Sequence, residues 1–350
     1  MTSKLRLLHS VFLWLPLKTF AATAGLAIET EVTIPTKQNA GVSASVFTVN
    51  SKEFRISVLS TASLGNQDVG GPVRASVKDL AKYDSQMPTR KESSLFVNGG
   101  FSGSLPDRPV GLLVTGGRMV SIPNYSKLAG DPKNSCPHLR DERYRFSGLV
   151  CVKADRSVYV GKFGESQIEN CTEAVQAGPL LVSEKVGNSI CPQEAMQPAA
   201  RRTAICTDSD RNSNDVLRIV VTNQPVTLFE LAAWLAKPVG QGGLGCTSAV
   251  NMSGDNSSGA VLVDGRSATK GSANVYGDGS YPQASVLSIT GPTSAVFMEN
   301  DTNDTASLKP QIQRSAASTA AARQPAPISR ETSTLPQRNS DRVAAKRESK

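Results

Sequence analysis

The chain has 350 residues, enough for one large domain or two small ones, and only 5% of them are aromatic and 19% charged. Its net charge of +8 resides at the two ends: residues 1–28 carry three basic and no acidic residues, and residues 302–350 carry nine basic against four acidic residues. Residues 29–301 therefore carry no net charge, so the basic composition is no evidence for a nucleic-acid-binding face on the folded part, and no nucleic-acid partner is expected.

The first 24 residues have the layout of a secretory signal peptide. Lys4 and Arg6 precede a short apolar run at 11–17, and Ala22-Thr23-Ala24 supplies a small-residue cleavage site. Lys18 interrupts the apolar region, so an amphipathic N-terminal helix is the alternative. We expect residues 1–24 to be removed and the mature protein to be exported, to the periplasm or outside the cell. No other segment has 18 uninterrupted apolar residues, so no membrane span is expected.

Short apolar runs between polar turns predict a β-rich middle of the chain. Strands are predicted at 54–59, 94–99, 110–115, 218–223 and 260–263. Residues 148–163 have the pattern of a hairpin whose turn is Asp155 to Ser157, and the apolar runs on either side of SGDNSSG (253–259) have the pattern of a second hairpin.

Two helices are predicted from their capping residues. Ser76 is followed three residues later by Asp79 at the start of SVKDLAKY (76–83), and Thr227 is followed by Glu230 in TLFELAAWLAK (227–237). Pro238 ends the second helix near residue 237. We therefore predict an α+β fold over residues 29–300, a single domain with one mixed or antiparallel sheet and a few packed helices.

Small and polar residues directly follow predicted strands at four places. In the first, LFVNGGFSG, Asn98 offers a directional donor and acceptor, while Gly99 and Gly100 let the backbone approach a ligand. In the second, CTEAVQAGPLLV, Gln176 precedes a tight bend at Gly178. Each motif alone is also typical of an ordinary turn.

The other two clusters contain groups that suit an anion. In RRTAICTDSD, Arg201 and Arg202 precede Thr203, and an arginine fork matches a pair of phosphate oxygens, although paired arginines are usually solvated. The stretch 251–258 offers successive backbone amides as a possible anion nest, with polar side chains around it. Its candidate ligand-binding residues are Asn251, Ser253, Gly254, Ser257 and Ser258.

Six cysteines lie in the central part of the chain and none in the leader or the tail: Cys136, Cys151, Cys171, Cys191, Cys206 and Cys246. An even number in an exported protein favours disulfides, whose pairing the sequence leaves open, and we expect at least two cysteines to be paired. The chain lacks a CxxC motif and has only His138 outside the leader, so no metal or cofactor is expected.

Residues 301–350 lose hydrophobic periodicity and are rich in Ser, Thr, Ala, Pro and Arg. We expect a disordered basic tail, because such a segment cannot bury enough apolar surface to fold. The alternative for this tail is a weak electrostatic contact with an anionic envelope.

Taken in order, eight blocks of the sequence resemble the phosphodiester glycosidase family. The blocks are SVKDLAKY, LFVNGGF, PVGLLVTGGRMVS, AVQAGPLLV, RTAI, RIVVTN, VTLFELAAWLA and AVNMSGDNSSG, and they span roughly residues 75–265. The resemblance implies an exported hydrolase that cleaves the bond between a sugar C1 and a phosphodiester, with a phosphoglycan or sugar phosphodiester as substrate. It also implies that the 251–258 segment lines the active site.

The sequence departs from the family pattern within that segment. The family reads Asn-Leu-Asp-Gly-Gly-Gly-Ser-Ser, whereas this chain has Ser253 at the position of the Asp and a carboxylate two residues later, at Asp255. In the NGGF block, Ser102 stands where a second aromatic residue is often found. A serine cannot act as an ionised base or nucleophile without a partner base.

Hydrolysis at C1 requires donors for the departing phosphate and a carboxylate that directs water. Arg202 and the 253–258 loop suit the first task. For the carboxylate, Asp255 is the first candidate and Glu230 the second, although Glu230 also fits a helix-capping role; Asp208 and Asp210 fit turns. The alternative functions are a non-catalytic sugar-phosphate- or glycan-binding protein and, on composition alone, an envelope-anchoring protein.

Overall fold

The computed structural model describes residues 26–37, 41–61, 75–85, 92–102, 109–125, 146–184, 187–190, 198–208, 215–263, 273–292 and 296–298. The predicted signal peptide at 1–24 and the predicted basic tail at 301–350 lie outside these residues. So do Cys136, His138 and Cys191.

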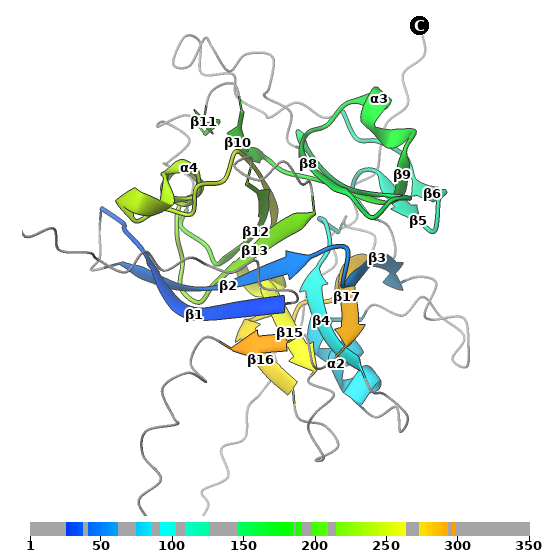
Figure 1. Cartoon of the computed structure of the whole chain (residues 1–350), viewed down its shortest axis with the longest axis horizontal. Helices are drawn as coiled ribbons and strands as arrows, with labels where there is room; N and C mark the ends of the chain where they lie inside the picture. Colours follow the sequence, from blue (N-terminus) through cyan, green and yellow to red (C-terminus); the bar gives the residue numbers. More distant parts are fainter. Residues whose placement is uncertain are drawn as a thin grey trace, which may run out of the picture. The chain divides into compact units, whose positions relative to one another are not determined.

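Three β-sheets make up most of the described structure (Figure 1). The eight-stranded sheet has the order β11 (Gly187–Asn188), β10 (Leu180–Ser183), β14 (Ser248–Gly254), β12 (Arg202–Thr207), β13 (Val216–Thr222), β2 (Val42–Asn50), β1 (Leu26–Ile34) and β18 (Val296–Met298). The β4 sheet has the order β16 (Ala273–Gly277), β15 (Gly259–Val263), β4 (Glu92–Asn98), β17 (Ser285–Pro292) and β3 (Arg55–Ser60). The β9 sheet has the order β6 (Arg118–Ser121), β5 (Leu113–Thr115), β9 (Cys171–Ala177), β7 (Gly148–Lys153) and β8 (Val158–Lys162). The β1–β18 pair is parallel, and the other strand pairs of the described residues are antiparallel.

Helices are few and short. They are α2 (Val77–Ser85), α3 (Glu165–Ile168) and α4 (Leu228–Ala236), together with the 3-10 turns η3 (Val239–Gln241) and η4 (Asp255–Ser257). None of the helices in the described part of the chain combines the length and apolar character that a membrane crossing would need.

One hydrophobic core is shared by all three sheets. It contains Phe47 and Val221 from the eight-stranded sheet, Leu95 from the β4 sheet, and Val150 and Val175 from the β9 sheet, and all five are almost fully buried. Because strand residues alternate between two faces, the opposite face of the eight-stranded sheet is free to bury a second core against α4.

Helices α4 and α2 each cover one sheet (Figure 1). Leu231 and Trp234 of α4 pack against the eight-stranded sheet. Val77 and Ala81 of α2 pack against the β4 sheet beside Phe96. The two helices thus seal the outer faces of two sheets and form no layer of their own.

The prediction of an α+β fold with one sheet is wrong. Strands account for 55% and helices for 14% of the described residues, so the fold is mostly β. The strands that sequence reasoning missed include β2 and β17, whose sequences VSASVFTVN and SVLSITGP mix serine and threonine with apolar residues. These small hydroxyl side chains are buried between strands, as at Ser45 and Ser285, so their polarity does not mark an exposed segment.

The predicted strands, the 148–163 hairpin and both helix caps agree with the structure. The predicted strands correspond to β3, β4, β5, β13 and β15, and β7 and β8 form the predicted hairpin, with the Asp155 carboxylate accepting from the Ser157 N–H at 2.9 Å. Both helix caps are present: the Ser76 hydroxyl accepts from the Asp79 N–H at 3.1 Å, and Thr227 and Glu230 form the reciprocal capping box.

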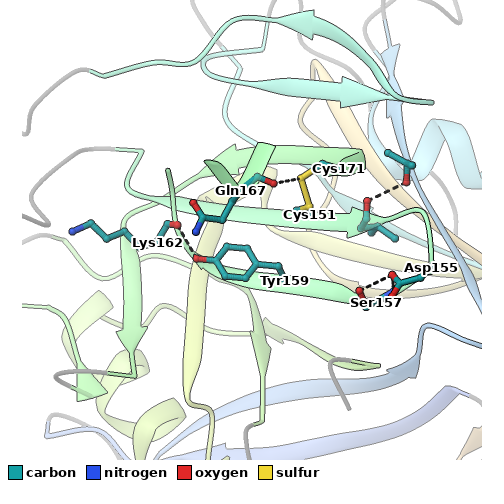
Figure 2. The surroundings of a disulfide bond; sticks show 9 residues. Cys151, Asp155, Ser157, Tyr159, Lys162, Gln167 and Cys171 are labelled. Carbon is teal, nitrogen blue, oxygen red and sulfur yellow. Dashed lines mark hydrogen bonds between the residues drawn. A yellow bond between two sulfur atoms is a disulfide. The ribbon is translucent and has the colours of Figure 1, made fainter. Parts of the chain in front are cut away.

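Two disulfides confirm the prediction that at least two cysteines are paired. Cys151–Cys171 joins β7 to β9, and Figure 2 shows it beside Tyr159 of β8. The Gln167 carbonyl oxygen lies 3.0 Å from Cys171 Sγ, which is a close contact and not a hydrogen bond, because a disulfide sulfur carries no proton. The second disulfide, Cys206–Cys246, joins β12 to the segment before β14.

Candidate functional site

The SGDNSS segment connects two different sheets. It begins at the end of β14 in the eight-stranded sheet, passes through η4, and enters β15 in the β4 sheet. The predicted hairpin is therefore wrong. Both edges of β14 are occupied, by β10 and β12, which leaves β15 no edge of that sheet on which to pair. The residues 255–258, called the crossing loop below, thus lie where the two sheets meet.

Strand β12 places Arg202 and Thr203 beside the start of the crossing loop. Arg202 pairs with Gly254, and Thr203 pairs with Ser253, which is buried. A Cβ at position 254 would lie 2.8 Å from Arg202 Nη1, so the guanidinium lies directly over the glycine backbone. A side chain at position 254 would displace Arg202.

The Arg202 guanidinium is half-buried and poorly satisfied. Its Nη2 donates to the Pro198 carbonyl at 3.4 Å, while its Nε is buried and lacks a partner among the described residues. Burial lowers the pKa of Arg202 below its ordinary value, and the charge of Asp255 offsets part of this shift. A desolvated cation with an unused donor is suited to bind an anion.

Arg201 has a different environment from its neighbour. Its Nη2 donates to the Asn256 side-chain oxygen and to Asp278 Oδ2, both at 2.9 Å. The pair of arginines therefore divides into one that is compensated by a carboxylate and one, Arg202, that is not in direct contact with a carboxylate among the described residues.

Asn251 joins the crossing-loop strand to the Gly178 bend. Its Nδ2 donates to the Gly178 carbonyl at 3.0 Å, and its Oδ1 is buried with no partner among the described residues. The Thr203 hydroxyl is likewise buried and unpartnered there.

The Asn98-Gly99-Gly100 block reaches the other end of the crossing loop. Asn98 Oδ1 accepts from the Gly259 N–H at 3.1 Å, while its Nδ2 is buried without a partner in the described chain. Gly99 packs against the Ser285 backbone, where a Cβ would lie 2.6 Å from the Ser285 carbonyl oxygen. Gly100 is adjacent to the β9 sheet, because a Cβ there would lie 3.2 Å from the Gln176 carbonyl oxygen.

The Gln176 side chain is engaged with the backbone. Its Oε1 accepts from the N–H groups of Leu112 at 3.0 Å and Asn124 at 2.8 Å. Its Nε2 donates to the carbonyls of Asn124 at 2.8 Å and Phe146 at 2.9 Å. These four bonds use the whole capacity of the amide, so its side chain holds the β9 sheet together and has no hydrogen-bonding group left for a ligand.

Asp255 lies at the exposed tip of the crossing loop. Its φ of 53° is in the left-handed region, which aspartate tolerates better than most residues. Its N–H donates to the Arg201 carbonyl at 2.9 Å, and its carbonyl accepts from the Ser258 N–H at 3.0 Å. Ser257 is half-buried, and Ser258 is fully buried and donates its hydroxyl to the Arg201 carbonyl at 3.1 Å.

Glu230, the second candidate carboxylate, has partners of another kind. Its Oε2 accepts from the Thr227 hydroxyl at 2.7 Å, and its Oε1 accepts from the Lys37 N–H at 3.0 Å. Oε2 thus caps the start of α4, and Oε1 holds the segment that follows β1. Asp208 forms an ion pair with Arg218 at 3.4 Å, and Asp210 lies outside the described residues.

The structure brings most of the predicted residues into one chain of contacts. Asn251 contacts Gly178, Gly254 contacts Arg202, and Asn98 contacts the residue after Ser258. Seven buried side-chain polar atoms in the described part of the chain lack a partner, and five of them lie in this group: Asn98 Nδ2, Arg201 Nε, Arg202 Nε, Thr203 Oγ1 and Asn251 Oδ1. Buried polar atoms normally find partners, so their concentration here favours this group as a binding site.

Sequence reasoning missed two residues that hold this region. Asp278, after β16, pairs with Arg201, and Ser285 of β17 accepts from the Gly99 and Gly100 N–H groups through its carbonyl and hydroxyl. The sequence signal for Asp278 is the Gly-Asp-Gly run at 277–279, which is typical of a turn with positive φ angles. No group of three or more His, Cys, Asp or Glu suited to a metal ion occurs among the residues whose positions are described.

Three solved structures are similar to this chain. The catalytic domain of zebrafish N-acetylglucosamine-1-phosphodiester alpha-N-acetylglucosaminidase, auto-inhibited by its pro-peptide, is 14% identical, with 77% of this chain and 84% of that chain covered and a TM-score of 0.47. A hypothetical protein from Synechocystis is 12% identical, with 76% and 62% covered and a TM-score of 0.46. A Burkholderia pseudomallei protein described as exported is 13% identical, with 71% and 74% covered and a TM-score of 0.41.

No curated protein sequence matches. The sequence model of the phosphodiester glycosidase family, in contrast, matches residues 92–289, which is more than half of the chain and includes the residues from Asn98 to the crossing loop. The chain therefore belongs to the phosphodiester glycosidase family.

Proposed function

We propose that this protein is an exported hydrolase that cleaves the bond between a sugar C1 and a phosphodiester in a glycan or envelope polymer. The observation that carries the proposal is the Arg202 guanidinium, which is desolvated and has a buried Nε without a partner in the described chain. The family membership supplies the class of reaction.

Arg202 is proposed to bind the phosphate. A phosphodiester carries one negative charge, and a guanidinium can offer two parallel donors to its two free oxygens. The neighbouring arginine already pairs with Asp278, whereas Arg202 has no carboxylate in direct contact among the described residues. The Thr203 hydroxyl and the Asn98 amide, both with unpartnered buried atoms, are proposed to contribute further hydrogen bonds to the substrate.

Asp255 is proposed to act on the water molecule. In the reaction the C1–O bond breaks, the electron pair leaves with the phosphate as a monoester, and water adds to C1. Asp255 accepts the proton of that water, while Arg202 stabilises the charge that grows on the departing phosphate. Arg202 lies opposite Gly254, the residue before Asp255, and the charge of Asp255 offsets part of the lowering of the Arg202 pKa by burial, which supports their assignment to one site.

A specific observation favours the alternative of a non-catalytic sugar-phosphate-binding protein. Ser253 occupies the place of the family's aspartate, and it is buried opposite Thr203, whereas Asp255 is exposed at the loop tip. If the reaction requires a buried carboxylate at that position, the same scaffold binds the substrate without cleaving it.

A diester of N-acetylglucosamine 1-phosphate with p-nitrophenol tests the proposal. Cleavage at C1 releases p-nitrophenyl phosphate, which turns yellow only after an added phosphatase removes the phosphate. Colour without phosphatase would indicate cleavage at phosphorus and would contradict the proposal. Binding measured by calorimetry without turnover would support the alternative, and neither binding nor turnover across a panel of sugars would overturn both.

Variants assign the two roles. Asp255→Asn is expected to lower kcat by about a hundredfold or more with little change in binding. Arg202→Lys is expected to weaken binding by about tenfold or more and to lower kcat as well, because it keeps the charge but loses the planar fork. Matched controls are the exposed residues Glu169 and Arg118, changed to Gln and Lys, which should leave both quantities unchanged.

Export and domain limits also remain proposals. The two disulfides are typical of proteins outside the reducing cytoplasm and support export. We propose that residues 1–24 are removed, that 29–300 form the catalytic domain, and that 301–350 form a disordered tail. N-terminal sequencing of protein recovered from outside the cytoplasm is expected to begin after Ala24, and a retained Met1 in a cytoplasmic fraction would contradict export.

A further inference from the structure

The crossing loop is held from one side by Arg201. The Arg201 carbonyl accepts from the Asp255 N–H at 2.9 Å and from the Ser258 hydroxyl at 3.1 Å, which fixes both ends of the loop. The Arg201 guanidinium donates to the Asn256 side chain at 2.9 Å, which fixes its middle. One residue at the start of β12 therefore contacts three of the four residues of the loop.

The segment after β16 holds the loop from the other side. The N–H groups of Asp278 and Gly279 donate to the Ser258 carbonyl at 2.9 and 3.0 Å, and the Tyr281 N–H donates to the Asn256 carbonyl at 3.1 Å. The Arg201–Asp278 ion pair joins the segment before β12 directly to the segment after β16, with 2.9 Å between Nη2 and Oδ2. The crossing loop and these two segments thus form a closed ring of contacts.

The charges of this ring are balanced locally. Asp278 Oδ2 pairs with Arg201, and its Oδ1 lies 3.7 Å from Lys78 Nζ of α2. The Arg201 guanidinium is already paired with Asp278 and hydrogen-bonded to Asn256 of the loop, so its charge is not available to a substrate. This distinguishes it from Arg202, one residue away.

We propose that Arg201 and Asp278 form a clasp that fixes the crossing loop and thereby sets the position of Asp255 relative to Arg202. Both are positioning residues, and neither needs to touch the substrate. Asp255 has a left-handed backbone, a conformation that persists only where surrounding contacts impose it. The Arg201 carbonyl restrains the Asp255 backbone through the Asp255 N–H. The Arg201 guanidinium restrains it through the side chain of the following residue, Asn256.

The clasp also links the ends of two sheets at this point. Arg201 precedes β12 of the eight-stranded sheet, and Asp278 follows β16 of the β4 sheet. Without the ion pair, the two segments that hold the loop would be connected to each other only through the loop's own hydrogen bonds. Its role in catalysis rests on the proposed function, whereas the immobilisation of the loop does not.

Amide hydrogen exchange tests the clasp independently of activity. Asp278→Asn and Arg201→Gln are expected to speed exchange at the Asp255 and Ser258 amides by about tenfold, because the contacts that restrict opening are lost. Arg201→Lys is expected to have a smaller effect, since it retains the ion pair. The control is Asp215→Asn, which removes an ion pair of similar exposure with Lys52 and should leave these amides unchanged.

Amides of the β7–β8 hairpin report on global stability. Unchanged exchange at residues 255–258 in Arg201→Gln would overturn the clasp, and so would an equal increase in the hairpin, because the effect would then be general destabilisation. In the p-nitrophenyl diester assay, both variants are expected to lower kcat more than they raise KM. If the wild-type protein neither binds nor cleaves any diester, the proposed function fails, and the exchange result still decides whether the clasp exists.

Discussion

The Gln176 side chain provides the sharpest test of what the structure adds to the sequence. The sequence assigns it to substrate binding, whereas the structure uses all four of its hydrogen-bonding positions on the backbone of the β9 sheet region. The perturbation is Gln176→Leu, which keeps a side chain of similar size but removes every hydrogen bond. It should act on stability, irrespective of any ligand.

The magnitude follows from the groups left behind. Leu112 and Phe146 are buried, so the Leu112 N–H and the Phe146 carbonyl lose the Gln176 amide in a place that water reaches poorly. Each buried backbone group that loses its hydrogen bond costs about 1–3 kcal/mol, whereas the half-exposed Asn124 can exchange its bonds for water. We therefore expect the free energy of unfolding to fall by about 2–6 kcal/mol.

The assay is guanidinium unfolding with the disulfides intact, followed by fluorescence of the buried Trp234. Gln241→Leu removes an exposed amide and serves as the control, with a change expected within about 0.5 kcal/mol. If Gln176→Leu unfolds at the wild-type denaturant concentration but loses diester binding, the amide serves the ligand and our reasoning is wrong.

Three further predictions concern packing, pH and the second disulfide. Gly99→Ala should lower the free energy of unfolding by about 1–3 kcal/mol in the same assay, because its Cβ would press on the Ser285 backbone. The pKa of Asp278 is lowered from its ordinary value of 3.8, first by the hydrogen bond from Ser280 and further by the charge of Arg201. The stabilising contribution of the Asp278 carboxylate is therefore present above pH 3.8 and is lost as the pH falls through the lowered pKa. Relative to the intrinsic amide exchange rate at each pH, exchange at the crossing loop should therefore accelerate in that acid range. Replacing Cys206 and Cys246 together by serine should cost about 4 kcal/mol, because the closed loop spans 40 residues.

Each of these has a control or a contrary outcome. Gly240 has open space around its Cβ position, so Gly240→Ala should be neutral where Gly99→Ala is not. Asp278→Asn should lose the acid-dependent acceleration, and an unchanged pH profile in that variant would point to another carboxylate. A double serine variant as stable as the wild-type protein would show that the second disulfide does not restrain the unfolded chain.

Short-range structure was accessible from the sequence because it depends on neighbouring residues. Ser76 and Thr227 cap helices through acidic residues three positions later, and both caps form as predicted. The 148–163 hairpin is similarly set by its own turn. The fold class was not accessible in this way, since the number of sheets depends on which distant strands pair. The occupied edges of β14, for example, send β15 to another sheet.

The site shows the same division. By itself the sequence determined which residues carry suitable chemistry, and their order along the chain was enough to indicate the family that comparison then showed. Only the tertiary structure decided their roles. Arg201 and Arg202 are adjacent and chemically identical, yet Asp278, 77 residues away from Arg201, pairs with one and does not contact the other. A side chain's role depends on the partners that folding brings to it. Such partners, like Asp278 for Arg201, come from distant segments, and the sequence alone does not show which distant segments meet.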